Sequence, residues 1–334
     1  MKKIYSMAIL LLAASLATMS LTSCEADGFD ERTVGNLDGD LTSDLPAGYR
    51  VRTVGDISYA YKSNGKLDYI RMNDEKFDMS GNTLEVKRDE GTAEFTFKFN
   101  ALNNLVKINY KLKSANADNS AGAVVKFNYI SRQLTGIEVE SEEQFVEDGQ
   151  KITYAYDADY EFTYDNQSLR RLKVKTTETE SNGGDKKTAK QTHSYSFKYD
   201  NTPDFYNRFY QWTPHVADAC LGEQEDIISA MAYIGMLGRA TRQLPYAIIC
   251  ETEGKDLSGR TVDDDFKFEC DYEFNSYDAI RVADDVKYTY TERRDDYEVK
   301  ANGFDFDADT RAAVAERSLL NIGLLNHMRH HNRK

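Results

Sequence analysis

Apolar and polar residues alternate over much of this sequence, and this period of two limits the folds that the chain can adopt. Phe95, Phe97 and Phe99, for example, are separated by single polar residues. Successive side chains of a β-strand point to opposite faces of a sheet, so the pattern predicts strands with one buried face. It returns at residues 106–112, 125–129, 162–164, 195–199, 266–274 and 286–290. Many such strands separated by turn residues predict an antiparallel meander.

A degenerate repeat is superposed on this alternation. Each copy has two aromatic residues two positions apart, a polar turn, and two aliphatic residues three positions apart. We therefore predict a sheet that grows hairpin by hairpin, in which each aromatic pair covers the aliphatic pair of the returning strand. The copies begin at Tyr59, Phe97, Phe127, Phe162 and Tyr272, and their aliphatic pairs are Leu67 and Ile70, Leu105 and Ile108, Leu134 and Ile137, Leu169 and Leu172, and Ala279 and Val282.

Two segments depart from the period of two. Between about residues 222 and 238 apolar residues recur at intervals of three and four after several acidic residues, which is typical of a helix and its start. From Asp309 or Thr310 onwards a second helical pattern follows, and its last 18 residues contain four basic residues and no acidic one. We therefore expect a mostly β fold, a curled antiparallel meander or barrel-like sheet with one inserted helix near 223–238 and a C-terminal helix.

The N-terminus has the pattern of an export signal. Lys2 and Lys3 precede an apolar run of about 16 residues, which is short for a membrane span. The run closes with Leu21-Thr22-Ser23-Cys24, which resembles the lipobox of bacterial lipoproteins and implies acylation of Cys24, for example with palmitate. A plain secretory signal is the alternative. The predicted organisation is a signal peptide at 1–23, an acidic flexible tether at 24–48, a β-rich domain at 49–308 and a basic C-terminal helix or tail at 309–334.

The charge of the chain bears on its partners and location. The formal net charge is −14, and removing residues 1–23 with their two lysines makes it −16. Phosphate binding needs a positive surface, so this charge argues against nucleic acid as a partner. We expect an outer-membrane protein held by its lipid anchor, on the periplasmic side or at the cell surface. The cell surface is favoured because the acidic residues directly after Cys24 resemble a surface-export signal.

One segment resembles a known family. The run Tyr233-Ile234-Gly235-Met236-Leu237-Gly238-Arg239, followed by Gln243-Leu244-Pro245 and Tyr272-x-Phe274-x5-Ile280, is similar to the centre of an uncharacterised family of lipoproteins from gut-type Gram-negative bacteria. That family is described as a domain of unknown function with a porin-like fold, and the resemblance extends over residues 59–292. It implies a curled antiparallel sheet. The family has no assigned catalytic residues, so it implies none in this chain.

Candidate metal and disulfide sites are few. Asp305, Asp307, Asp309 and Glu316 have the spacing of a calcium loop, but Thr310 stands where that loop needs glycine. An acidic loop before a capped helix is therefore favoured, and no metal is expected. Cys250 and Cys270 flank a loop and would form a disulfide if their hairpin centred near residue 260; two free thiols are an equal alternative.

The sequence also contains a candidate ligand-stacking site. Tyr206, Tyr210 and Trp212 lie close together before Pro214 and could stack on a sugar. The favoured interpretation is a loop that these rings fix to the core, because tyrosine is abundant in every predicted strand.

Enzyme signatures such as Gly-x-Ser-x-Gly, a phosphate-binding loop or His-Glu-x-x-His are absent from the sequence. We therefore expect no enzyme and no cofactor, but a role in binding or in envelope assembly, with an envelope protein or a glycan as partner. One alternative is the binding of a glycan or small ligand on a concave sheet face, which predicts a patch of aromatic and acidic residues. The second is a hydrolase with a dispersed carboxylate site.

Overall fold

The hairpins expected from the repeat are present in the structure, a computed structural model that describes residue 45 and residues 49–291 with short gaps. The gaps are 64–66, 73–74, 80–82, 89–90, 103, 115–118, 131, 148, 200–205, 222–226 and 276–277. The predicted export signal, Cys24, nearly all of the tether, the calcium-loop residues Asp305, Asp307, Asp309 and Glu316, and the C-terminal helix at 309–334 lie outside the described residues.

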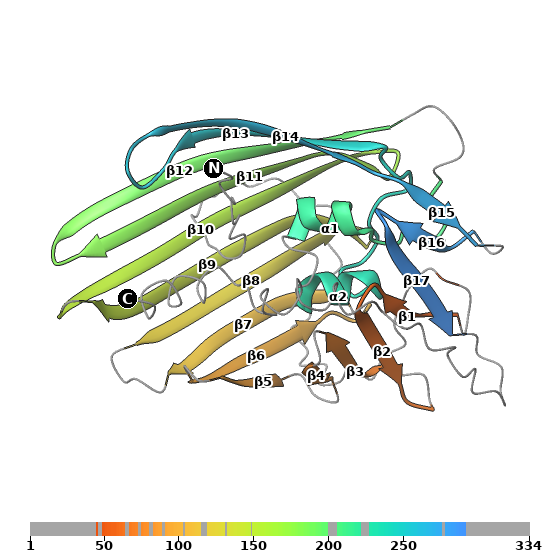
Figure 1. The fold of residues 1–334 in the computed structure, drawn as a ribbon, viewed down its shortest axis with the longest axis horizontal. Helices are drawn as coiled ribbons and strands as arrows, with labels where there is room; N and C mark the ends of the chain where they lie inside the picture. Colours follow the sequence, from red (N-terminus) through yellow and green to blue (C-terminus); the bar gives the residue numbers. More distant parts are fainter. Residues whose placement is uncertain are drawn as a thin grey trace.

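The described strands form two antiparallel sheets (Figure 1). The larger sheet has ten strands in the order β14-β13-β12-β11-β10-β9-β8-β7-β6-β5. Since β5 and β14 are its two edges, it is an open meander and not a closed barrel. Its strands are β5 Thr83–Arg88, β6 Gly91–Phe99, β7 Leu105–Ser114, β8 Ser120–Ile130, β9 Gln133–Glu147, β10 Gln150–Asp165, β11 Ser168–Asn182, β12 Asp185–Lys198, β13 Ala247–Lys255 and β14 Thr261–Glu269.

The smaller sheet has seven strands in the order β15-β16-β17-β1-β2-β3-β4. It joins the two ends of the described chain, because β1 pairs with β17. Its strands are β1 Arg50–Val54, β2 Ile57–Tyr61, β3 Leu67–Met72, β4 Glu75–Asp78, β15 Tyr272–Phe274, β16 Ile280–Ala283 and β17 Val286–Thr291.

Each copy of the repeat forms one hairpin with a β-bulge beside its turn. In the first copy Tyr59 pairs with Ile70 and Tyr61 with Leu67, and the register shifts between these pairs. The copies that begin at Phe97, Phe127 and Phe162 pair in the same way. A bulge inserts one extra residue into one strand of a pair. It therefore explains why aromatic residues two positions apart face aliphatic residues three positions apart.

The last copy forms the predicted hairpin with a register that differs by one residue. Tyr272 pairs with Ala283 and Phe274 with Ile280. The aliphatic pair is thus Ile280 and Ala283, both fully buried, and the predicted pair of Ala279 and Val282 was wrong. The segment 266–274 also differs from the prediction of a single strand, because β14 and β15 belong to different sheets.

Tyrosine hydroxyls connect successive hairpins of the larger sheet. Tyr129 donates a hydrogen bond to the carbonyl of Leu105 (2.6 Å) and Tyr164 to that of Leu134 (2.9 Å), and Tyr199 donates in the same way to Leu169. Each of these leucines is the first or second residue of the strand that follows a bulged turn. A bulge interrupts the ladder of backbone hydrogen bonds, so the tyrosine supplies a donor where the ladder is incomplete.

Two short helices lie on one face of the ten-stranded sheet, which is the inner face (Figure 1). They are α1 Pro214–Leu221 and α2 Ile227–Tyr233. The helix predicted near 223–238 corresponds to α2, which ends earlier because Gly235 adopts a positive φ of 85°. The sequence analysis missed α1, although proline at a first helical position is a typical start signal. Neither α1 nor α2 is long and apolar enough to cross a membrane.

The segment after α2, residues 236–242, crosses the turns of three successive hairpins and is called the strap. The amide of Leu105 donates to the carbonyl of Met236 (2.7 Å), and the amides of Arg239 and Arg242 donate to the carbonyls of Arg132 (2.7 Å) and Gln167 (3.0 Å). Three extended residues span about 10 Å, which equals the width of two strands at about 4.8 Å each. One contact every third residue therefore matches one hairpin turn.

Gly238 provides a test of the strap. Its φ is +70°, and a Cβ there would lie 2.2 Å from the carbonyl oxygen of Arg132. Gly238→Ala should therefore lower the free energy of unfolding by about 3 kcal/mol or more. Gly183→Ala is the matched control, because Gly183 also has a positive φ but has no atom within 4 Å of its Cβ position; it should cost about 1 kcal/mol. Equal losses in urea unfolding would show that the strap contact is unimportant.

Candidate functional site

The inner face of the ten-stranded sheet changes from apolar to polar along its strands. Beside the helices it is apolar, and a small space there is lined by Val125, Phe127, Ile137, Val139, Tyr160, Cys220, Leu221 and Ile228. Residues two apart on a strand share a face, so the inner face continues beyond the helices through a set of mostly polar residues. These form the polar inner patch: Ser141, Glu143, Tyr154, Tyr156, Thr176, Glu178, Glu180 and Lys187.

Strand register brings the members of this patch together. Tyr154 of β10 lies between Glu143 of β9 and Glu180 of β11, and Glu180 lies opposite Lys187 of β12. In the neighbouring row Tyr156 lies between Ser141 and Glu178. Side chains directly opposite on adjacent strands have Cβ atoms about 5 Å apart. Acidic and tyrosine side chains therefore alternate across adjacent strands.

One acid of the patch has clear partners. The Tyr154 hydroxyl donates to Glu180 Oε2 (2.7 Å), and Lys187 Nζ donates to Glu180 Oε1 (3.0 Å). Both are donors aimed at a carboxylate, so Glu180 is stabilised as an ion. The phenol ring of Tyr154 also stacks on the ring of Phe145, with a centroid separation of 5.9 Å and an angle of 10° between the ring planes. These contacts hold Tyr154 in a defined orientation.

Glu143 is in the opposite situation. The residue is only 2% exposed, and its Oε1 has no hydrogen-bond partner among the described residues. Burial raises the pKa of its carboxyl to about 8, so at neutral pH the group is mostly protonated and can both donate and accept. Buried polar atoms are nearly always paired. An unpaired one with a shifted pKa therefore marks Glu143 as a candidate for contact with a ligand.

Burial shifts the titration of two other groups at the patch towards their uncharged forms. Burial raises the pKa of the Glu178 carboxyl and lowers the pKa of the His193 imidazole. His193 Nδ1 lies 2.9 Å from Thr252 Oγ1, and both residues are buried. The combination of neutral donors and acceptors, a carboxylate and aromatic rings is suited to a ligand rich in hydroxyl groups.

Sequence reasoning did not identify this patch. Glu143 and Glu178 stand at inner-facing positions of strands that carry apolar residues, Val139 and Val174, at the inner positions four residues earlier. That interruption of the alternation is the signal that could have found them. It shows only that a polar residue faces inward, and the register decides which residues of other strands lie beside it.

The predicted stacking residues do not form one platform. Trp212 is 1% exposed, and its Nε1 donates to the carbonyl of Gly238 (3.1 Å), so it belongs to the core. The guanidinium of Arg242 lies over the ring of Tyr206 at 5.5 Å, and that of Arg239 over Tyr210 at 4.6 Å. The Tyr210 hydroxyl donates to Gln167 (2.5 Å). Trp212 is therefore part of the core, whereas Tyr206 is exposed and Tyr210 is half-buried.

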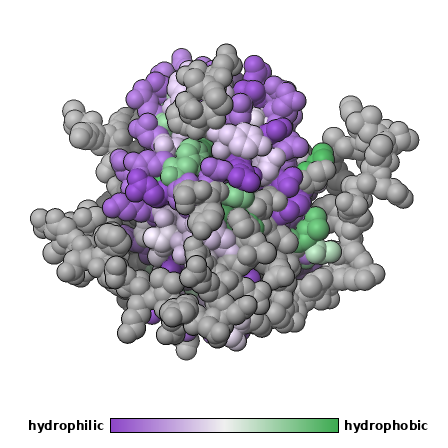
Figure 2. All heavy atoms as spheres, turned by 90° about the vertical axis from the view of Figure 1, so that its right-hand side faces the viewer, coloured by the Kyte–Doolittle hydropathy of each residue, from purple (hydrophilic) through white to green (hydrophobic). Residues whose placement is uncertain are grey.

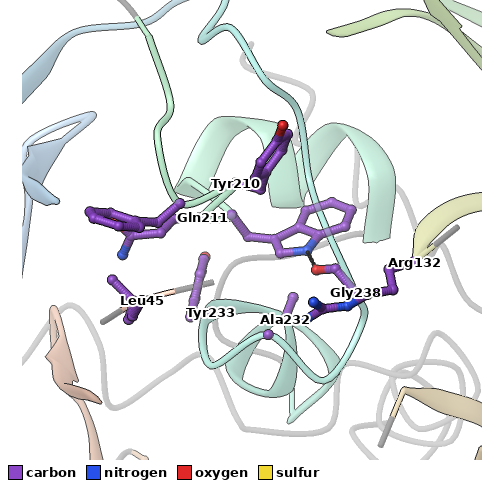
Figure 3. A pocket seen from close by; sticks show the side chains of 10 residues that line it. Leu45, Arg132, Tyr210, Gln211, Ala232, Tyr233 and Gly238 are labelled. Carbon is purple, nitrogen blue, oxygen red and sulfur yellow. Dashed lines mark hydrogen bonds between the residues drawn. The ribbon is translucent and has the colours of Figure 1, made fainter. Parts of the chain in front are cut away.

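A narrow pocket lies beside these residues. Figure 3 shows Tyr210, Arg132 and Gly238 around it, together with Leu45 and Tyr233. Its free space admits only about one or two water molecules. The space between the sheet and α1 and α2 is also small, and it has no polar lining. Neither is large enough for a sugar ring.

Cys250 and Cys270 are free, buried thiols. The hairpin of β13 and β14 pairs Cys250 with Phe266, so it centres on residue 258 and not near 260. Cys270 lies four residues beyond Phe266, about 13 Å along an extended strand, and its amide donates to the carbonyl of Tyr246 (2.9 Å). The predicted disulfide is therefore not formed. Within the described part of the chain, no three His, Cys, Asp or Glu side chains lie where they could hold one metal ion.

Comparison with known proteins finds a distant structural similarity. No protein-family model matches the sequence, and no curated protein matches it. Among solved structures, the chain is similar to a porin-like protein from Bacteroides vulgatus ATCC 8482, with a TM-score of 0.38 and 12% sequence identity. The similarity covers 75% of this chain and 100% of that chain.

The burial of Glu143 predicts a pH-dependent effect of its replacement. The folded state keeps the proton up to about pH 8, whereas the unfolded state loses it near pH 4.5, so the wild type loses stability as pH rises between these values. Glu143→Gln does not titrate. The difference in the free energy of unfolding, variant minus wild type, should therefore be roughly 3 kcal/mol larger at pH 7.5 than at pH 4.5. The variant thus gains stability relative to the wild type as pH rises.

Urea unfolding at the two pH values measures this difference. Glu140→Gln is the matched control, because Glu140 lies on the same strand but is exposed on the outer face. The free energy of unfolding of Glu140→Gln, relative to the wild type, should differ little between the two pH values. The same pH dependence in both variants would mean that Glu143 is not buried in solution.

Proposed function

We propose that this protein is a non-catalytic binding protein whose polar inner patch takes up a hydroxyl-rich ligand, with a glycan as the best chemical match. The observation that carries the proposal is the buried carboxyl of Glu143, whose Oε1 has no hydrogen-bond partner among the described residues, in a row of tyrosine and acidic side chains. A protein would gain nothing in stability from such a group. A ligand hydroxyl that pairs with it would remove the cost of leaving it unpaired.

The chemistry of the patch supports a sugar over an apolar or anionic ligand. Tyr154 and Tyr156 provide aromatic rings, and Glu178 provides a further carboxyl group. Sugars present hydroxyls that both donate and accept, together with C–H faces that pack on aromatic rings. An anionic ligand would be repelled by the carboxylate of Glu180, which already accepts hydrogen bonds from Tyr154 and Lys187.

We further propose that the protein acts at the outer membrane, anchored through an acylated Cys24, and that it faces the cell surface. The support is the lipobox-like ending of the N-terminal apolar run and the acidic residues that follow it. The resemblance to the lipoprotein family of unknown function agrees with this location. A binding protein tethered at the surface would meet extracellular glycans directly.

A ligand screen tests the binding proposal. Soluble oligosaccharides of different composition are added to the purified mature chain, and ligands that raise its melting temperature are titrated by calorimetry. Tyr156→Ala and Glu178→Gln should each weaken binding at least tenfold, because each removes a contact inside a largely desolvated patch. Affinity should also fall as pH rises through about 8, where Glu143 loses its proton.

Glu140→Gln and Asp157→Asn are the controls for this screen, since both residues lie on the outer face of the same strands. Unfolding curves of all variants establish that they are folded. The proposal fails if no oligosaccharide stabilises the protein, or if the outer-face variants weaken binding as much as the inner-face ones.

The anchor is tested separately in cells. Cys24→Ser should remove metabolic labelling with a palmitate analogue and move the protein from the membrane fraction to the soluble fraction, because no acyl chain remains to bind lipid. Protease treatment of intact cells expressing the wild type should degrade the domain if it faces outward. Unchanged labelling in the variant would disprove acylation at Cys24.

A further inference from the structure

The exposed apolar residues of this protein are concentrated at one end of the ten-stranded sheet. Five large hydrophobic residues are exposed in the described part of the chain, and four of them belong to this end. Leu102 (46% exposed) and Ile130 (69%) lie at the turns after β6 and β8, and Tyr206 (44%) and Tyr246 (45%) lie between β12 and β13. The fifth, Val146, is near the β9–β10 turn at the opposite end.

Arginine residues lie among these apolar side chains. Arg132, Arg208, Arg239 and Arg242 belong to a hairpin turn, the segment leading to α1 or the strap, and Arg170 is the third residue of β11. Together with Leu102, Ile130, Tyr206 and Tyr246 they are called the arginine rim. Figure 2 faces this end of the molecule, where hydrophobic residues lie among hydrophilic ones. The cationic character is unexpected in a chain with a formal net charge of −14.

Aromatic contacts hold the arginines at the surface. The guanidinium groups of Arg170 and Arg239 each lie 4.6 Å from a tyrosine ring centroid, and that of Arg242 lies over Tyr206. Two carboxylates face the rim: Asp165 is 3.4 Å from Arg170 and Asp278 is 2.6 Å from Arg208. Both ion pairs are exposed, and exposed pairs exchange readily with other anions.

The spacing of these residues makes the rim an extended surface. The turns after β6, β8 and β10 are two strands apart, and the strap ties each of them to the next. At about 4.8 Å per strand these three turns span about 20 Å. A surface this wide with shallow apolar tips fits a flat partner better than a small ligand.

We propose that the arginine rim rests on a membrane surface that contains anionic phospholipids. Arginine binds lipid phosphates through paired N–H donors. Tyrosine prefers the boundary between headgroups and acyl chains, and the tips Ile130 and Leu102 insert below the headgroups. This arrangement of exposed apolar tips surrounded by cations is the chemistry of an interfacial membrane contact.

The entry of the chain supports the same orientation. Leu45, which precedes β1, lines a pocket with Arg132 and Tyr210, so the chain enters the domain at this end (Figure 3). Leu45 lies 21 positions after Cys24, and a chain of that length spans at most about 70 Å. The rim contact does not depend on the proposed acylation, but an anchor at Cys24 would hold this end close to the bilayer.

Vesicle sedimentation tests the proposal without any contribution from an acyl chain. The mature chain from residue 24, with Cys24→Ser, is mixed with vesicles of phosphatidylcholine alone or with one third phosphatidylglycerol. Binding should be stronger to the anionic vesicles and should decrease with salt. Arg242→Ala should reduce binding to anionic vesicles about fivefold. Ile130→Ser should reduce it by a similar factor on both kinds of vesicle.

Val146→Ser and Lys186→Ala are the matched controls, because Val146 and Lys186 are exposed residues near turns at the opposite end of the sheet. Both should bind vesicles like the parent chain. The proposal is overturned if the parent chain does not bind anionic vesicles, if it binds both kinds equally, or if the controls lose as much binding as the rim variants. Failure of the glycan screen would leave this result unaffected, since the rim and the inner patch share no residue.

Discussion

The inner face of a ten-stranded sheet is too large to be covered by two short helices, and this mismatch governs the rest of the structure. Where α1 and α2 pack, the inner face carries Phe127, Ile137 and Val174, as the hydrophobic effect requires. Beyond the helices the same strands change to Ser141, Glu143 and Tyr156. The inward side chains of a long antiparallel strand can change from apolar to polar in this way, because the backbone hydrogen bonds do not depend on which side chain each inward position carries. The result is a sheet whose inner face is apolar beside the helices and mostly polar beyond them.

The hairpin repeat supplies the rigidity that both halves need. The bulge in each hairpin turns two aromatic residues onto two aliphatic ones. Tyrosine hydroxyls then bond to the next hairpin, and the strap fixes the turns at a regular distance. The turn after β8 also carries Ile130 outward, while Arg132 of the same turn lines the pocket beside Leu45. Core packing and the proposed membrane contact therefore both depend on the same hairpins. Tyrosine contributes to each hairpin, which explains why it is so abundant in this chain.

The sequence predicted the hairpins well because the aromatic and aliphatic pairs are local signals. It predicted α2 but missed α1, because the aromatic residues before Pro214 favoured a loop there, although Pro214 is the first residue of a helix. The register of the last hairpin was wrong by one residue, since Ala279 and Ile280 are both buried and the pattern could not choose between them. Trp212 was considered for ligand stacking, whereas the structure places it in the core. Burial of a single ring depends on residues distant in the chain, here Gly238.

By itself, the sequence determined the repeated hairpins and the aromatic and aliphatic residues that face inward in them, because these follow from residues a few positions apart. It also contains the pattern of an exported, lipid-anchored chain. Only the tertiary structure decided that Glu143, Tyr154 and Glu180 lie in one row and that Arg132, Arg239 and Arg242 share one end of the sheet. The physical reason is that strand register brings Glu143 and Glu180 together across 37 positions of the chain, and the path of the strap brings Arg132 and Arg242 together across 110.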